Sequence, residues 1–152
     1  MMTNSPSEPA PSPQQPPAEA ATQQANNTAK LGLPRERRLR RAADFQRVYQ
    51  RRCRASDPYL LAYGCESHLP YPRLGLAVSR RVGKAVLRNR WKRRLREAFR
   101  RQAHALPAGL DLILVPHATS LPSLHVLSQS LRRLAFRLAK RLADEADARE
   151  EA

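Results

Sequence analysis

The sequence has few of the residues that a protein needs to hold a metal ion or a catalytic nucleophile. It contains two cysteines and four histidines among 152 residues, and Cys53 and Cys65 stand twelve positions apart. That spacing fits neither a zinc site nor a disulfide framework, so we expect free thiols and no cofactor bound by the protein itself. No apolar run approaches the length of a membrane span, and residues 1–30 lack the charged start and apolar core of a signal peptide. We therefore expect no membrane partner and a cytoplasmic location.

Acidic residues are scarce where basic residues are dense. Residues 34–101 hold 21 lysines and arginines against five acids, whereas residues 1–33 carry a net charge of −1 and residues 102–152 a net charge of 0. The five acids are spread over separate predicted elements, so they do not form the carboxylate cluster with which a nuclease holds metal ions. No Ser/His/Asp or Cys/His set is apparent either. Such localised positive charge is typical of a protein that binds a polyanion, and no catalytic set of its own can be proposed.

Composition divides the chain into three parts. Residues 1–33 are rich in Pro, Ala, Gln and Ser and nearly lack large apolar side chains, which predicts a disordered tail. Residues 34–143 carry the periodic apolar residues and predict one RNA-binding domain. Residues 144–152, DEADAREEA, predict a separate acidic C-terminal tail.

The most informative stretch is residues 80–101, RRVGKAVLRNRWKRRLREAFRR, with eleven basic residues and one acid, Glu97. After a short basic loop over 80–83, apolar residues recur at helical steps: Leu87, Trp91, Leu95 and Ala98. The pattern predicts a helix with this stripe buried and a row of cations held outward. Like charges at this spacing destabilise a helix, so we expect a polyphosphate to neutralise them.

Two segments precede this helix on the N-terminal side. Residues 34–41, PRERRLRR, place five arginines around Leu39 and predict a flexible arm that contacts phosphates, or else a solvated approach to the next element. Residues 42–50 predict a short helix with Ala42, Phe45 and Val48 in the core. Tyr49 either joins that core or stacks on an unpaired base.

The other patterns predict a small α+β sandwich in the order α-β-β-β-α-β-α. Strands are expected at 52–55, 59–66 and 73–79, and the apolar run 110–115 predicts a central strand covered on both faces. In the strand at 73–79, Gly75, Ala77 and Ser79 form a face of small residues that allows close approach of a helix or a ligand. A leucine stripe over 124–142 predicts a final helix capped by Ser120 or Ser123.

These residues resemble one known family, the protein subunit of bacterial ribonuclease P, over residues 35–142. The resemblance rests on Arg88-Asn89-Arg90 followed by Lys92-Arg93, Arg96 and Phe99, on the strand 73–79 directly before it, and on Asp44-Phe45-Gln46. The N-terminal tail lies outside the pattern. Trp91 stands where a smaller aliphatic residue is expected, which raises a question of local packing.

The resemblance implies a fold and a division of labour. The family joins a catalytic RNA to form the enzyme that removes the 5′ leader from precursor tRNA by endonucleolytic cleavage, with the active site and its magnesium ions in the RNA. One protein is expected with one RNA. The protein binds RNA and holds the single-stranded leader in a cleft between the first helix and the sheet. The family fold also contains a left-handed βαβ crossover, against the usual right-handed rule.

Residue roles are implied by the same resemblance. Leader contact is implied for three aromatic residues with Arg81 beside them: Phe45, Tyr49 and Tyr63. RNA binding is implied for the basic motif and its neighbours: Arg81, Arg88, Asn89, Arg90, Lys92, Arg93 and Arg96.

Two other function classes compete with this interpretation. A ribosomal or other structural RNA-binding protein would share the composition, and only Arg88-Asn89-Arg90 after its strand argues against it. A membrane-active or partner-binding basic helix would not need the predicted strands and final helix.

Overall fold

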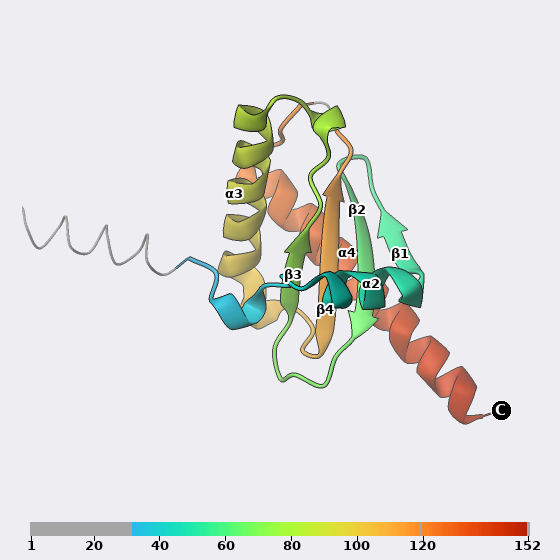
Figure 1. The fold of residues 1–152 in the computed structure, drawn as a ribbon. Coiled ribbons are helices and arrows are strands. Elements are labelled where there is room, and N and C mark those ends of the chain that lie inside the picture. The colour runs from blue at the N-terminus through green and yellow to red at the C-terminus, as the bar shows by residue number, and fades with distance from the viewer. Residues whose placement is uncertain (1–31, 119, 152) are drawn as a thin grey trace, which may run out of the picture. The chain divides into compact units, whose positions relative to one another are not determined.

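A mixed four-stranded sheet carries the fold (Figure 1). The computed structural model describes residues 32–118 and 120–151. The strands pair in the order β1-β2-β4-β3, with β3 parallel to β4 and the other pairs antiparallel. Their bounds are β1 (Cys53–Ser56), β2 (Leu60–Glu66), β3 (Arg73–Leu76) and β4 (Leu110–Pro116). Strand β4 is central, as its apolar run predicted, because such a sequence tolerates cover on both faces.

Three α-helices complete the predicted order α-β-β-β-α-β-α, which is confirmed: α2 (Ala42–Arg51), α3 (Ala85–Gln102) and α4 (Leu124–Glu150). Helices α3 and α4 cover one face of the sheet and α2 lies on the other (Figure 1). In Figure 1 β3 and β4 both run upward, β3 lies to the left of β4, and the chain between them passes through α3 on the far side. That connection is left-handed, as the resemblance implied and against the usual preference.

The main core lies between the sheet and the two long helices. The apolar stripe of α3 is confirmed, since Trp91, Leu95, Ala98 and Phe99 are all fully buried against leucines of α4 and β4. Trp91 therefore belongs to the centre of the core. Its indole Nε1 has no hydrogen-bond partner in the described part of the chain, a cost that its large apolar burial must outweigh.

A smaller core joins α2 to the opposite face of the sheet. A Cβ on Gly75 would lie 3.0 Å from Cζ of Phe45 and 3.2 Å from Cβ of Leu39. The predicted close approach is thus confirmed at Gly75, because only a small residue there admits α2 and the segment before it so closely. Ala77 and Ser79 lie after the end of β3 and line a groove instead. Val48 is buried at this contact, but Ala42 is exposed, so its predicted core position is wrong.

A buried carboxylate fixes this second layer. Asp111 in β4 is fully buried and accepts hydrogen bonds from Arg73 at 2.8 and 2.6 Å and another from Arg47 of α2. The prediction of an apolar central strand overlooked this residue. Two guanidinium groups neutralise the charge and tie α2 and β3 to the centre of the sheet.

Element ends differ from the prediction in several places. Strand β3 ends at Leu76, three residues before the predicted end at Ser79, and β1 is displaced by one residue from the predicted 52–55. The segment before α2 forms the 3-10 helix η1 (Arg35–Arg37), and Leu39 is buried and donates its N–H to Leu74 O at 2.9 Å. It is therefore held along β3, and the prediction of a flexible arm is wrong. A second 3-10 helix, η2 (Arg80–Val82), precedes α3. Helix α4 starts at Ser123, whose hydroxyl caps Val126 N, and continues to Glu150 across the predicted acidic tail.

The predicted N-terminal tail lies outside the described residues, apart from Gly32 and Leu33, and Leu33 is buried in the main core. Within the described ranges, no helix combines the length and apolar character needed to cross a membrane.

We predict that Asp111→Ala lowers the free energy of unfolding by about 3 kcal/mol, because it leaves two arginines without their buried counter-charge. The control is Glu97→Ala, which removes a half-exposed ion pair on α3 and should cost less than about 1 kcal/mol. Urea unfolding of both variants at neutral pH measures the difference. Equal losses would show that Asp111 does not fix the second layer.

Candidate nucleic-acid interface

The cations of α3 fall on two flanks of the helix, because the buried stripe points Trp91 and Leu95 into the core. Lys92 and Arg96 face the segment before α2 and the edge of β3. Arg90 and Arg93 face the start of α4. The basic residues of α3 therefore line two different hollows, one shared with the segment before α2 and the other with the start of α4.

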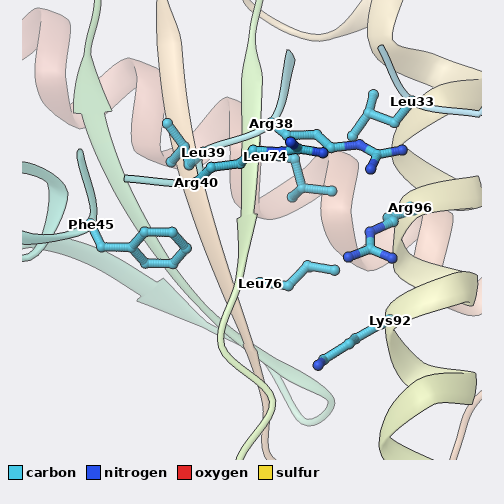
Figure 2. A pocket seen from close by; sticks show the side chains of 9 residues that line it. All are labelled: Leu33, Arg38, Leu39, Arg40, Phe45, Leu74, Leu76, Lys92 and Arg96. Carbon is cyan, nitrogen blue, oxygen red and sulfur yellow. The ribbon is translucent and has the colours of Figure 1, made fainter. Parts of the chain in front are cut away.

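The first group forms what we call the cationic pocket, a cavity of about 170 Å³. Its four basic residues are Arg38, Arg40, Lys92 and Arg96, and its apolar wall is Leu33, Leu39, Phe45, Leu74 and Leu76. Figure 2 shows Lys92 and Arg96 reaching from α3 toward Leu76, with Phe45 on the opposite side. None of the described residues that line the cavity is acidic.

The charges in this pocket are not compensated. Burial, followed by the neighbouring charges of Arg38 and Arg40, lowers the pKa of Arg96. Within the described part of the chain none of the four cations forms an ion pair, and Nε of Arg38 is buried without a hydrogen-bond partner. Buried donors beside like charges are costly unless an anion satisfies them. The pocket is therefore suited to an oxyanion such as a phosphate.

An aromatic groove adjoins the pocket on the uncovered half of the sheet. It is lined by Tyr49 of α2, Leu61 and Tyr63 of β2, Val115 of β4, and Ala77, Val78 and Ser79 after β3. The rings of Tyr49 and Tyr63 pack edge to face with their centroids 4.9 Å apart. The ring centroid of Phe45 lies 6.5 Å from that of Tyr49. Phe45 lines the cationic pocket, so its ring lies between that pocket and Tyr49 of the groove. The three aromatic residues singled out by the sequence thus lie together.

Other predicted residues lie around these two sites. Arg81 is exposed in η2, two positions after Ser79 at the end of the groove. Asn89 is exposed on α3, and Arg88 is half-buried with an Nε that has no partner in the described chain. Arg90 and Arg93 line a separate hollow with Arg94, whose Nη1 donates to Pro122 O at 2.7 Å.

Three glutamates of the domain form ion pairs with arginines outside the cationic pocket. Glu97 pairs with Arg100 at 2.6 Å and Arg101 at 2.8 Å, and hydrogen bonds from these two arginines lower its pKa to about 2. The charge of Arg100, on the same helix, is thus neutralised within the protein. Arg51 is held by Glu66 and Glu145 at 3.0 and 2.6 Å.

The described residues offer no set of metal ligands. Across residues 32–118 and 120–151 no three His, Cys, Asp or Glu side chains gather in a way that would hold an ion. Both cysteines are free and buried, and burial raises the pKa of each thiol. The expectation of magnesium at an RNA active site stays a prediction.

Fold and surface together define a small basic α+β protein of the kind that binds a polyanion in a groove. The family model described as Ribonuclease P matches residues 33–142. The chain therefore belongs to the ribonuclease P protein family.

Individual relatives agree with this assignment. The ribonuclease P protein component of Proteus mirabilis is 39% identical over 106 residues, which cover 69% of this chain and 89% of that protein. The solved ribonuclease P protein of Thermotoga maritima is 30% identical with a TM-score of 0.61, covering 66% of this chain and 96% of that one. The protein from Staphylococcus aureus is 29% identical with a TM-score of 0.58, covering 68% and 95%. Family membership implies a role in the ribonuclease P holoenzyme and in tRNA processing, with ribonuclease P RNA as partner.

Sequence reasoning missed several residues of the interface. The sequence predicted a flexible arm that includes Arg38 and Arg40. The single apolar residue between them, Leu39, was a signal that this segment packs against the domain. Leu61, Ala77 and Val115 carry no chemical signature, and only the strand register places them beside the tyrosines.

We predict that Arg96→Ala lowers the slope of log affinity of the reconstituted holoenzyme for precursor tRNA against log salt concentration by about one, because one phosphate contact is lost. Arg100→Ala is the matched control on the same helix, since its charge is already paired with Glu97. Filter binding at several salt concentrations measures both slopes. Identical slopes for the two variants would contradict a phosphate in the cationic pocket.

Proposed function

We propose that this chain is the RNA-binding subunit that helps the catalytic RNA of ribonuclease P to remove the 5′ leader from precursor tRNA. The observation that carries the proposal is that an aromatic groove lies near a cationic pocket for which the described residues supply no acidic lining. Phe45 of the pocket has its ring centroid 6.5 Å from that of Tyr49 in the groove. Together they offer ring faces for unpaired bases and donors for the phosphates between them.

The groove suits a leader of variable sequence. Tyr49 is 38% exposed, so part of its ring is available to a base, and stacking on such a ring contributes roughly 1–3 kcal/mol per base whatever the base. No row of amide or carboxylate side chains lines the groove to read base edges. This composition supports binding by shape and charge, without sequence readout.

The second flank of α3 suits a different RNA segment. Arg90 and Arg93 face away from the cationic pocket, toward the start of α4, so a strand held in the groove does not reach them. We assign this flank to the catalytic RNA, and the groove with Arg81, Lys92 and Arg96 to the leader. One protein would then bridge enzyme RNA and substrate.

Catalysis is assigned to the RNA. Asp111, Glu66 and Glu97 are paired with arginines, and in the described residues no three acidic, His or Cys side chains gather to hold an ion. Bound magnesium would find phosphate oxygens in the RNA. The protein's contribution is to hold substrate and to lower the repulsion between two polyanions. The cytoplasmic location stays a prediction that rests on this function.

The first test is reconstitution. We predict that the purified chain leaves precursor tRNA intact and that addition of the cognate RNA gives cleavage at low magnesium concentration. Gel analysis of the 5′ product measures this. Cleavage by the protein alone, with contaminating nucleases excluded, would overturn the division of labour.

A second test addresses the groove. We predict that Tyr63→Ala weakens holoenzyme binding of precursor tRNA roughly tenfold and leaves mature tRNA nearly unaffected, because only the precursor has a base to stack. Tyr59→Ala is the control, since Tyr59 is 37% exposed and does not line the groove. Equal losses for precursor and mature tRNA would remove Tyr63 from leader contact.

A further inference from the structure

A second basic hollow lies at the opposite edge of the sheet from α3. This β1-edge hollow is a cavity of about 530 Å³ lined by Arg54, Ala55 and Ser56 of β1, Leu61 of β2, His117, and Arg137 and Arg141 of α4. Among residues 32–118 and 120–151, no acidic side chain lines it. None of its residues belongs to the basic motif of α3 or to the aromatic cluster.

The positive charge of the hollow is not neutralised by the protein. Arg137 donates to Ser56 O at 3.4 Å and Arg141 donates to Arg54 O. These bonds cover two free carbonyls of the edge strand, which is a structural reason for the two arginines to be there. A neutral carbonyl does not cancel the positive charge of an arginine, however. Each guanidinium donates to these carbonyls through one of its three nitrogens, so the other two can donate to a ligand. In the described residues, Arg54, Arg137 and Arg141 form no ion pair.

Helix α4 contributes to the hollow from its basic half, because its basic and acidic residues stand in separate stretches. Residues 132–141 of α4 hold five basic residues and no acid, whereas residues 144–151 hold five acids and one arginine. The net charge of zero over 102–152 conceals this division. Glu145 pairs with Arg51, and none of the acids of residues 144–151 is among the described residues that line the hollow.

The hollow is continuous with the aromatic groove. Leu61 lines both. Strand register places Ser56 beside Leu61 and Leu61 beside Val115, and Ala77, whose N–H bonds to Leu114 O, completes a row across the sheet. Four strands about 4.8 Å apart make this row about 15 Å long, the span of two or three nucleotides. Cations stand at both ends, with Arg81 beyond β3 and the hollow beyond β1.

We propose that the β1-edge hollow binds backbone phosphates of the leader nucleotides farthest from the cleavage site, so that a long leader is held more tightly than a short one. The inference rests on the proposed function, because it extends the path of the same strand. The occupant is single-stranded, since the track between the two cationic ends is made of apolar and aromatic side chains that suit unpaired bases.

The test compares Arg137→Gln/Arg141→Gln with the unchanged protein in the reconstituted holoenzyme. Precursors carry leaders of about two or about twelve nucleotides, lengths that stop before or pass the hollow. We expect the affinity for the long leader to fall about tenfold and its salt slope to drop by about 1.4, with less than about a twofold change for the short leader. The control is Arg132→Gln/Arg149→Gln, which removes the same charge from exposed sites on α4 outside the hollow.

A third variant separates charge from edge capping. Arg137→Lys/Arg141→Lys keeps both charges, so most of the long-leader affinity should return. If the lysine pair binds the long leader as weakly as the glutamine pair, the arginines act by capping β1 and the proposal fails. It also fails if the glutamine pair weakens long and short leaders equally, which would place the hollow on another part of the RNA.

The proposed function and this extension fail differently. If Tyr63→Ala still weakens precursor binding while the Arg137→Gln/Arg141→Gln variant matches its control, the leader groove stands and the hollow is not part of it. If the unchanged holoenzyme binds long, short and absent leaders alike, both proposals are overturned.

Discussion

The architecture of the site depends on one buried charge. Asp111 lies in the central strand, fully buried, and its carboxylate is held by Arg73 from the neighbouring strand and by Arg47 from α2. This contact places a short helix of ten residues at one end of the sheet's second face and leaves the rest of that face uncovered. Tyr49, on the same helix, is thereby held edge to face against Tyr63 of β2. A helix packed by apolar contacts alone would have no such fixed position.

The distribution of acids explains the surface. The carboxylates of Asp111, Glu66, Glu97 and Glu145 are paired with arginines that hold elements together or lie along one helix. The arginines and lysines of the cationic pocket and the β1-edge hollow form no ion pairs in the described chain. A high net charge therefore persists as local positive potential at both ends of the aromatic groove. Such a surface favours association with a polyanion at low salt and loses affinity as salt rises.

Periodicity predicted the elements and their order, because hydrophobic spacing is local. It located the buried stripe of α3, the central β4 and the close approach at Gly75. Periodicity did not predict the burial of residues whose partners lie far away in the sequence. Leu39 packs because β3 lies beside it, and Asp111 is tolerated because Arg47 arrives from an element 64 positions away in the sequence. The acidic end of α4 stayed helical although it has no apolar stripe beyond Leu142, since the helix was already nucleated by its packed part.

The sequence by itself determined the charge of this protein, its element order and its family, since these depend on residue identity and short spacings. It also supplied the aromatic residues and the basic motif of the interface. Only the tertiary structure decided which cations share a site. It placed the basic residues of α3 along two different hollows, joined one group to Arg38 and Arg40, and brought Arg137 and Arg141 to the edge of β1. The reason is that the electrostatic field of a surface depends on distances in space, which sequence position does not fix.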